Sequence, residues 1–306
     1  GRQSTVSAPV VGFEVPRKIG VLPKLALGMR RGPRIAVAGS DVTVAANNGE
    51  DLFAFHSPDA GRTWSAPVKI NDVAASAREG LHNLATGPAG QLYLTWLDLR
   101  SGGMEIYGAL SRDAGRSWAA NELVYHSPGG HVCECCHPSA AFNAKGDLAV
   151  MWRNWMAGSR DLWIAVRRAG GDRFEAAEKQ GEGTWNLAGC PMDGGALLAL
   201  EDGSFASVWR REQGIFLALK PGAEQRIATG TQPVAAVARG TVHLWWEQGP
   251  DLMHLAATNA IGAKPTLFAS GAKSASAAVS PKDGSVVVAF ERSVGGRKSI
   301  FVEVLR

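Results

Sequence analysis

The 306-residue chain has little cysteine and tyrosine, no long apolar run and no extended run of basic residues. A membrane-spanning helix needs about 18 or more consecutive apolar residues, and no stretch approaches that length, so a membrane span is excluded. Lysine and arginine never occur in runs longer than two. Although the net charge is +4, this scatter argues against a nucleic-acid partner. The start of the chain has no apolar leader, and we expect a mature or trimmed form.

The chain is rich in glycine and tryptophan instead, with 37 Gly and 10 Trp against 3 Tyr. Many glycines together with large aromatic anchors favour a turn-dense β protein over a helical one. Apolar residues make up 45% and charged residues 20% of the chain, which excludes intrinsic disorder. The length is within reach of one large all-β unit, and we expect a single domain over residues 1–306.

One octapeptide occurs twice. Residues 57–64 read Ser-Pro-Asp-Ala-Gly-Arg-Thr-Trp, and residues 111–118 repeat them as Ser-Arg-Asp-Ala-Gly-Arg-Ser-Trp. Each copy follows a strand-like run, so each predicts a turn in which Asp accepts backbone hydrogen bonds, Gly takes a positive φ and Trp packs inward. The octapeptide resembles the Asp-box, or BNR repeat, of sialidase-like β-propellers. In that family it is a structural hairpin between the outer strands of a blade, without a catalytic role.

The rest of the chain aligns as strand-turn-strand units that mostly end in Trp or Phe. They cover residues 35–46, 83–96, 139–152, 196–209, 234–246 and 277–290. Spacings of roughly 40 to 55 residues suit four-stranded blades. We therefore expect an all-β, six-bladed β-propeller of four-stranded antiparallel blades, in which residues 6–21 supply the strand that closes the last blade. Residues 169–174 resemble a decayed Asp-box.

All four cysteines fall in two loops, at residues 131–138 and 185–195, which precede the third and fourth innermost strands. In a propeller these loops converge around the axis, so the topology predicts a cysteine cluster there. The corresponding loop of the second blade carries His82. The soft donors in these loops form the candidate metal site: Cys133, Cys135, Cys136, Cys190, His137, His131, Met192 and His82.

Three interpretations of the cysteines remain open. Clustered thiolates flanked by His and Met match the preference of copper(I), with zinc as second choice. Alternatively, two disulfides pair Cys133 with Cys136 and Cys135 with Cys190, since a bridge between adjacent cysteines is strained. Redox-active thiols are the third. We expect copper(I), with Trp155 and Trp185 keeping water away from it. His56, His126, His243 and His254 lie outside the converging loops and are expected to be structural.

The Cys-x-Cys-Cys and Cys-Pro-Met-Asp-Gly segments resemble those of an exported bacterial subgroup of sialidase-like proteins. The resemblance implies a periplasmic or secreted protein, in which cysteines survive oxidised or metal-bound. We expect a monomer whose role is copper handling or storage, with a metal ion as ligand and a copper-donor or acceptor protein as a further partner.

A sialidase-like glycosidase is the alternative function. That family holds its substrate carboxylate with three arginines and uses a Tyr nucleophile, a Glu and an Asp acid. Here only residues 33–36, Pro-Arg-Ile-Ala, echo its Arg-Ile-Pro element, and Tyr93, Tyr107 and Tyr125 all lie outside the late blades. We expect Asp98, Arg100, Arg153 and Arg160 to form Arg-carboxylate contacts between blades. A disulfide-stabilised propeller that binds carbohydrate or protein is a further alternative.

Overall fold

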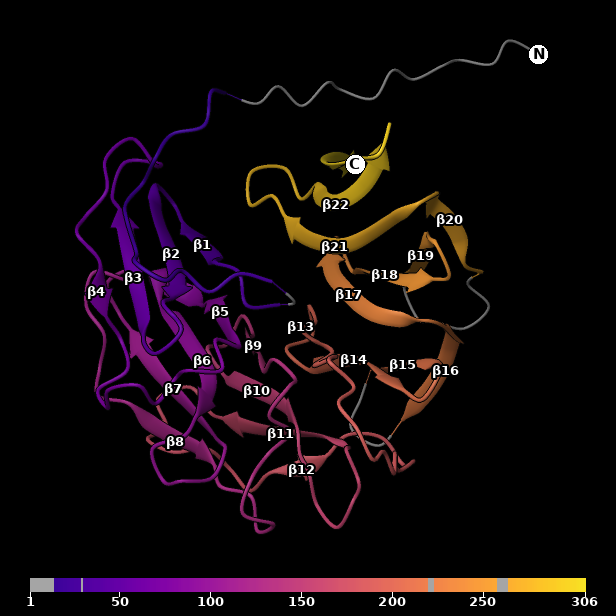
Figure 1. Cartoon of the computed structure of the whole chain (residues 1–306), viewed down its shortest axis with the longest axis horizontal. Coiled ribbons are helices and arrows are strands. Elements are labelled where there is room, and N and C mark those ends of the chain that lie inside the picture. The colour runs from indigo at the N-terminus through magenta and orange to yellow at the C-terminus, as the bar shows by residue number, and fades with distance from the viewer. Residues whose placement is uncertain (1–13, 29, 220–222, 258–263) are drawn as a thin grey trace.

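The computed structural model describes residues 14–28, 30–219, 223–257 and 264–306. Its strands form six antiparallel sheets arranged like blades around a central axis (Figure 1). Five sheets have four strands and the sixth has three among these residues. The prediction of a six-bladed, all-β propeller is confirmed.

The first three blades contain strands 1 to 12 in chain order. Their bounds are β1 (Arg34–Ala38), β2 (Asp41–Asn47), β3 (Leu52–Ser57), β4 (Val68–Lys69), β5 (His82–Thr86), β6 (Leu92–Asp98), β7 (Glu105–Ser111), β8 (Glu122–Tyr125), β9 (Ser139–Phe142), β10 (Leu148–Arg153), β11 (Leu162–Arg167) and β12 (Glu178–Lys179). A short 3-10 turn, η1 (Pro88–Gly90), joins β5 to β6.

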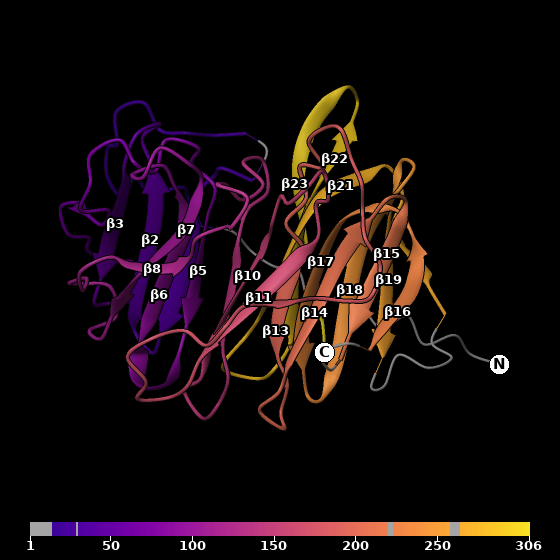
Figure 2. The same ribbon diagram turned by 90° about the horizontal axis from the view of Figure 1, so that it is seen from below.

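The last three blades contain strands 13 to 23. Their bounds are β13 (Ala196–Ala199), β14 (Phe205–Arg211), β15 (Gly214–Ala218), β16 (Glu224–Thr229), β17 (Thr231–Ala238), β18 (Thr241–Gln248), β19 (Asp251–Ala257), β20 (Thr266–Ala269), β21 (Ala272–Val279), β22 (Val286–Val294) and β23 (Arg297–Leu305). The first strands of successive blades, from β1 to β21, contact one another around the axis, and Figure 2 shows the blades side by side from below.

The hydrophobic core lies between blades rather than in one central mass. In blades 2 to 6 the second strand carries an almost fully buried aromatic residue, such as Trp96 of β6 and Trp152 of β10. Trp152 packs with Tyr93, so blades 2 and 3 share one apolar cluster. Full burial of such a side chain contributes roughly 1.5–3 kcal/mol, and this is why each repeat needs its neighbours.

Both Asp-boxes connect the third and fourth strands of their blades, as predicted. In the first, Asp59 accepts hydrogen bonds from the Thr63 backbone N–H at 2.8 Å and from the Ser57 hydroxyl at 2.9 Å. Gly61 has a φ of +84°. The prediction for the aromatic residue was only partly right. Trp118 packs on the core, whereas Trp64 stays in its turn and donates to the Gly61 carbonyl.

The predicted closing strand at residues 6–21 is not seen in its described part. Residues 14–21 form no strand, and the remaining residues of that segment lie outside the described ones. Gly20 instead packs so closely against the Phe55 ring of β3 that a side chain would not fit there. This stretch therefore follows the first blade and not the last.

Candidate metal centre

Two loops at one end of the propeller bring the cysteines together. The loop between β8 and β9 carries Cys133, Cys135 and Cys136, and the loop between β12 and β13 carries Cys190. The first loop is tied to the end of β10, because the Cys133 N–H donates to the Arg153 carbonyl at 2.9 Å. Since β9 and β13 line the axis, the loops that precede them meet there (Figure 1).

Three thiols form a compact group. The Cys133 sulfur lies 3.3 Å from that of Cys136 and 3.6 Å from that of Cys135. All three sulfur atoms lie within 4.8 Å of one another. Cys133 and Cys136 are 1% exposed and Cys135 is 9% exposed. All four cysteines are free, and Met192 packs against the three clustered ones. The structure thus brings together three predicted thiols and the predicted thioether.

Cys190 adjoins this group without belonging to it. Its side chain is exposed, and it is not part of the set whose sulfur atoms are all within 4.8 Å. Met192, two residues further along the chain, packs against the three clustered cysteines, so the segment that carries Cys190 borders the group. That Cys190 is itself a metal ligand stays a prediction.

The thiols share protons unequally. Hydrogen bonds with the Cys135 and Cys136 thiols hold the pKa of Cys133 well below that of a free cysteine. The pKa of Cys135 is raised, because this thiol interacts with Cys133. The pKa of Cys136 is raised by burial. The group therefore favours one thiolate, at Cys133, flanked by two thiols. A thiolate is the form that ligates metals.

Two arginines supply positive charge to the group. Arg160 donates from Nη1 to the Cys133 sulfur at 3.2 Å. Arg153 is 1% exposed and lowers the pKa of both Cys133 and Cys136 by its charge. It donates to three backbone carbonyls, those of Asp193, Arg160 and Arg210. These arginines were not predicted to act at the thiols, because no sequence pattern marks an arginine that binds carbonyl oxygens.

The expectation of Arg-carboxylate contacts was half right. Arg100 pairs with Asp98 at 2.9 Å and with Asp72 at 2.9 Å, and it also lies over the Tyr107 ring. Arg153 and Arg160 instead bond to carbonyl oxygens and to a thiol. The difference follows from their surroundings, since both face a loop that presents backbone rather than carboxylates.

The three predicted histidines do not join the thiols. His137 follows Cys136 directly, but the chain bends at Cys136, and the His137 ring lines the axial cavity described below. Burial, together with the charge of Arg30, lowers the pKa of His137 well below its usual value. His82 is buried next to the Gly80 carbonyl, and burial lowers its pKa to about 4. His131 lies 3.4 Å from Glu134 and edge-on to Trp155.

The two tryptophans expected to exclude water border the centre. Trp185 is 5% exposed, and the guanidinium groups of Arg153 and Arg210 lie over its ring at 5.2 and 5.3 Å. Trp155 is half-buried beside Arg160. Each tryptophan thus contacts one of the arginines that act on the thiols.

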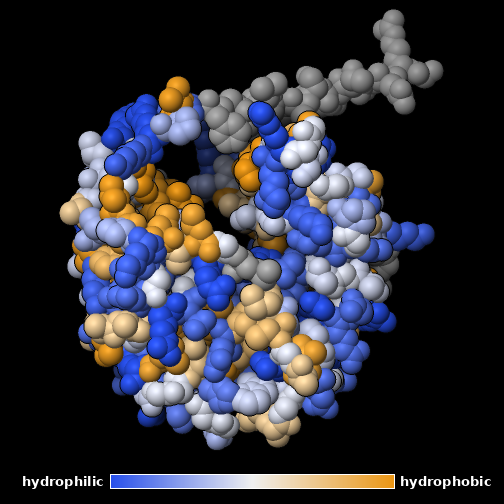
Figure 3. Space-filling view, viewed as in Figure 1, coloured by the Kyte–Doolittle hydropathy of each residue, from blue (hydrophilic) through white to orange (hydrophobic). Residues whose placement is uncertain are grey.

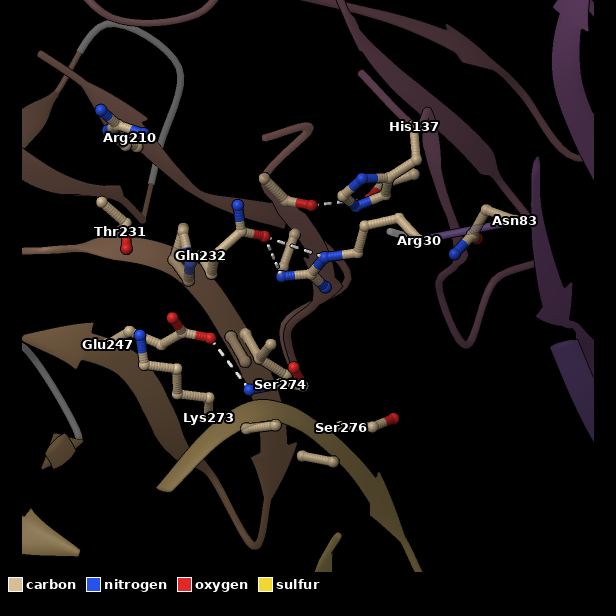
Figure 4. Close-up of a pocket in the computed structure, with 18 of the residues that line it drawn as sticks. Arg30, Asn83, His137, Arg210, Thr231, Gln232, Glu247, Lys273, Ser274 and Ser276 are labelled. Atoms are coloured by element: carbon tan, nitrogen blue, oxygen red, sulfur yellow. Dashed lines mark hydrogen bonds between the residues drawn. The ribbon is translucent and has the colours of Figure 1, made fainter. Parts of the chain in front are cut away.

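An axial cavity of about 650 Å³ lies beside the centre (Figure 4). Figure 3 shows the hollow near the axis in this face of the molecule. Four cations and one acid line the cavity: Arg30, Arg34, Arg210, Lys273 and Glu247. Arg30 donates to the Gln232 amide oxygen at 2.8 and 3.0 Å, and the Gln232 amide donates in turn to the Met192 carbonyl. No tyrosine is among the described residues that line it.

No protein-family model and no curated protein sequence matches the chain. Solved structures match over most of it. The α-L-arabinanase of Penicillium chrysogenum, complexed with arabinobiose, has 16% identity over 93% of this chain and 94% of that one, with a TM-score of 0.58. The intramolecular trans-sialidase of Ruminococcus gnavus, complexed with oseltamivir carboxylate, has 10% identity over 90% and 94%, with a TM-score of 0.56. AofleA of Arthrobotrys oligospora has 12% identity over 90% and 81%, with a TM-score of 0.56.

The chain therefore has the six-bladed propeller fold found in sialidases and arabinanases. At these identities the likeness establishes the fold and leaves the activity to be argued from the site. Within the described residues, no helix has the length and apolar character that crossing a membrane requires.

Proposed function

We propose that this chain binds copper(I) through the thiols of Cys133, Cys135 and Cys136, and that it handles or stores the metal. The observation that carries the proposal is the set of three largely buried sulfur atoms within 4.8 Å of one another. Thiolate and thioether ligands are soft donors that select copper(I), zinc or iron–sulfur clusters. Met192, packed against the thiols, adds such a thioether next to them.

Positive charges surround the three thiols, and they favour a bound copper(I) trithiolate over three neutral thiols without a metal. One copper(I) ion held by three thiolates carries an excess of negative charge, which is costly to bury without compensation. Arg160 at the Cys133 sulfur and the buried Arg153 supply that compensation. Zinc is the second choice, because structural zinc takes four tetrahedral ligands and the compact group offers three.

The proposed setting is the periplasm or the extracellular space, with the chain a monomer that exchanges copper with a donor or acceptor protein. The cysteine segments that resemble those of exported proteins support the compartment. Free thiols persist there only if a ligand protects them, so metal loading and disulfide formation compete for the same sulfur atoms.

Metal analysis together with a thiol count tests the proposal. We expect protein purified without chelator and under reducing conditions to carry about one equivalent of copper per chain, and to yield four titratable thiols after denaturation and copper removal. A protein that binds no copper and has no titratable thiol would favour the disulfides Cys133–Cys136 and Cys135–Cys190. About one tightly held zinc in place of copper would favour zinc.

A glycoside hydrolase is the second candidate, and the axial cavity is the observation that favours it. Glycosidases generally need two carboxyl groups, and sialidases replace one with a tyrosine. Glu247 is the one acid that lines this cavity among the described residues, and no tyrosine does so. We therefore expect no hydrolysis of a fluorogenic sialoside above the buffer blank. Turnover that disappears in Glu247→Gln would establish the hydrolase instead.

A further inference from the structure

The exposure of the four thiols is graded from the surface inward. Cys190 is exposed, Cys135 is 9% exposed, and Cys133 and Cys136 are 1% exposed. Met192, two residues after Cys190, packs against the three clustered cysteines, and the Cys135 sulfur lies 3.6 Å from that of Cys133. The exposed Cys190 segment therefore borders the cluster that contains the buried pair.

The segment that carries Cys190 is anchored at both ends and unanchored between them. The Leu187 carbonyl accepts a hydrogen bond from Arg160 at 3.1 Å, and the Met192 carbonyl accepts one from Gln232 at 3.1 Å. Between them, residues 188–191 take part in no backbone hydrogen bond within the described part of the chain. Cys133, by contrast, is held through its own N–H by the Arg153 carbonyl. Cys190 can therefore move while the buried thiols stay in place.

We infer that Cys190 is the transfer thiol of the proposed copper centre: it accepts copper(I) from a thiolate-ligated carrier and passes it to Cys135, without remaining a ligand of the loaded site. This inference rests on the proposed function. Arg160 bonds both to the Leu187 carbonyl, at the start of the Cys190 segment, and to the Cys133 sulfur, so one residue holds the segment beside the compact thiol group.

The transfer is a series of ligand exchanges in which copper stays in the +1 state. The Cys190 sulfur forms a bond to copper and loses its proton, and one carrier thiolate leaves and takes that proton. The Cys135 sulfur then bonds to copper and Cys190 is released as a thiol. Binding by Cys133 and Cys136 displaces the remaining carrier thiolate, and the other thiol protons pass to solvent. No oxidant or reductant is needed.

The inference predicts that Cys190→Ser slows loading without changing the final affinity. A serine hydroxyl has the size of the thiol but is a poor copper(I) ligand. In stopped-flow transfer from a copper(I)–glutathione complex, we expect the rate to fall at least about tenfold, within the range typical of losing a metal-site group. Competition at equilibrium with bathocuproine disulfonate should give the wild-type affinity within about threefold. Transfer back to glutathione should slow by the same factor.

Three further variants separate the possible causes. Cys190→Met keeps a soft donor and should restore part of the rate, whereas Ala188→Ser alters the same exposed segment and should leave the rate unchanged. Cys136→Ser should lose equilibrium affinity. An unchanged rate in Cys190→Ser, or an affinity as low as that of Cys136→Ser, overturns the transfer role while the copper site stands. Absence of copper(I) binding by the wild-type protein overturns the proposed function itself.

Discussion

Replacing Cys136 by serine should weaken copper(I) binding by roughly a hundredfold or more, which corresponds to at least about 2.7 kcal/mol. The thiol lies 3.3 Å from the Cys133 sulfur and is 1% exposed, so water from solvent does not readily take its place. The two sulfur atoms left in the compact group, those of Cys133 and Cys135, would hold copper with an incomplete ligand set. Competition with a chromogenic copper(I) chelator under anaerobic conditions measures the loss.

Cys190→Ser is the matched control for this experiment, because it makes the same chemical change at a sulfur outside the compact group. The unfolding midpoint of each metal-free variant shows whether the fold survives the substitution. A folded Cys136→Ser protein that retains wild-type copper affinity would contradict the trithiolate site. Excess copper(I) should also raise the free energy of unfolding of the wild type, by about 4 kcal/mol at a thousandfold excess over Kd, and with it the unfolding midpoint.

The blade repeat could be predicted because each unit has the same physical requirement. From the second blade on, each inner hairpin buries an aromatic residue, and Trp96 and Trp152 pack against the preceding blade, so that the requirement recurs at regular spacing. The closing strand lacked such a signal. Nothing in residues 14–21 indicates that Gly20 would pack on Phe55 of the first blade.

Only the cysteine cluster of the site could be predicted, because it depends on spacing along the chain and on the order of the blades. Cys133, Cys135 and Cys136 are close in sequence, and the neighbouring blade brings the segment of Cys190 and Met192 next to them. Side-chain direction decided the rest. The chain bends at Cys136, so that its thiol lies with the other cysteines while the ring of His137 lines the axial cavity.

Arg153→Met should cost both stability and copper affinity. The guanidinium donates to three carbonyls on two loops and a neighbouring blade, those of Asp193, Arg160 and Arg210. Methionine keeps an unbranched stem but has no guanidinium and donates nothing, so three carbonyl oxygens lose a partner at about 1–3 kcal/mol for each one that stays buried. We expect a total loss of roughly 3–5 kcal/mol, as for other broken buried networks. Chemical denaturation of the metal-free protein measures it.

The copper(I) affinity of Arg153→Met separates the effect of the Arg153 charge from the effect of its hydrogen bonds to the loops. Without Arg153, only Arg160 remains to offset the negative charge of a copper(I) trithiolate, so copper(I) affinity should fall about tenfold to a hundredfold. Arg153→Lys keeps the charge but cannot reach three carbonyls, and it should lose stability while keeping most of the affinity. Equal copper(I) affinity in the wild type and both variants would mean that Arg153 stabilises the loops and does not affect metal binding. Loss of affinity in Arg153→Met alone would show that the bound metal complex is anionic, as three thiolates around copper(I) require.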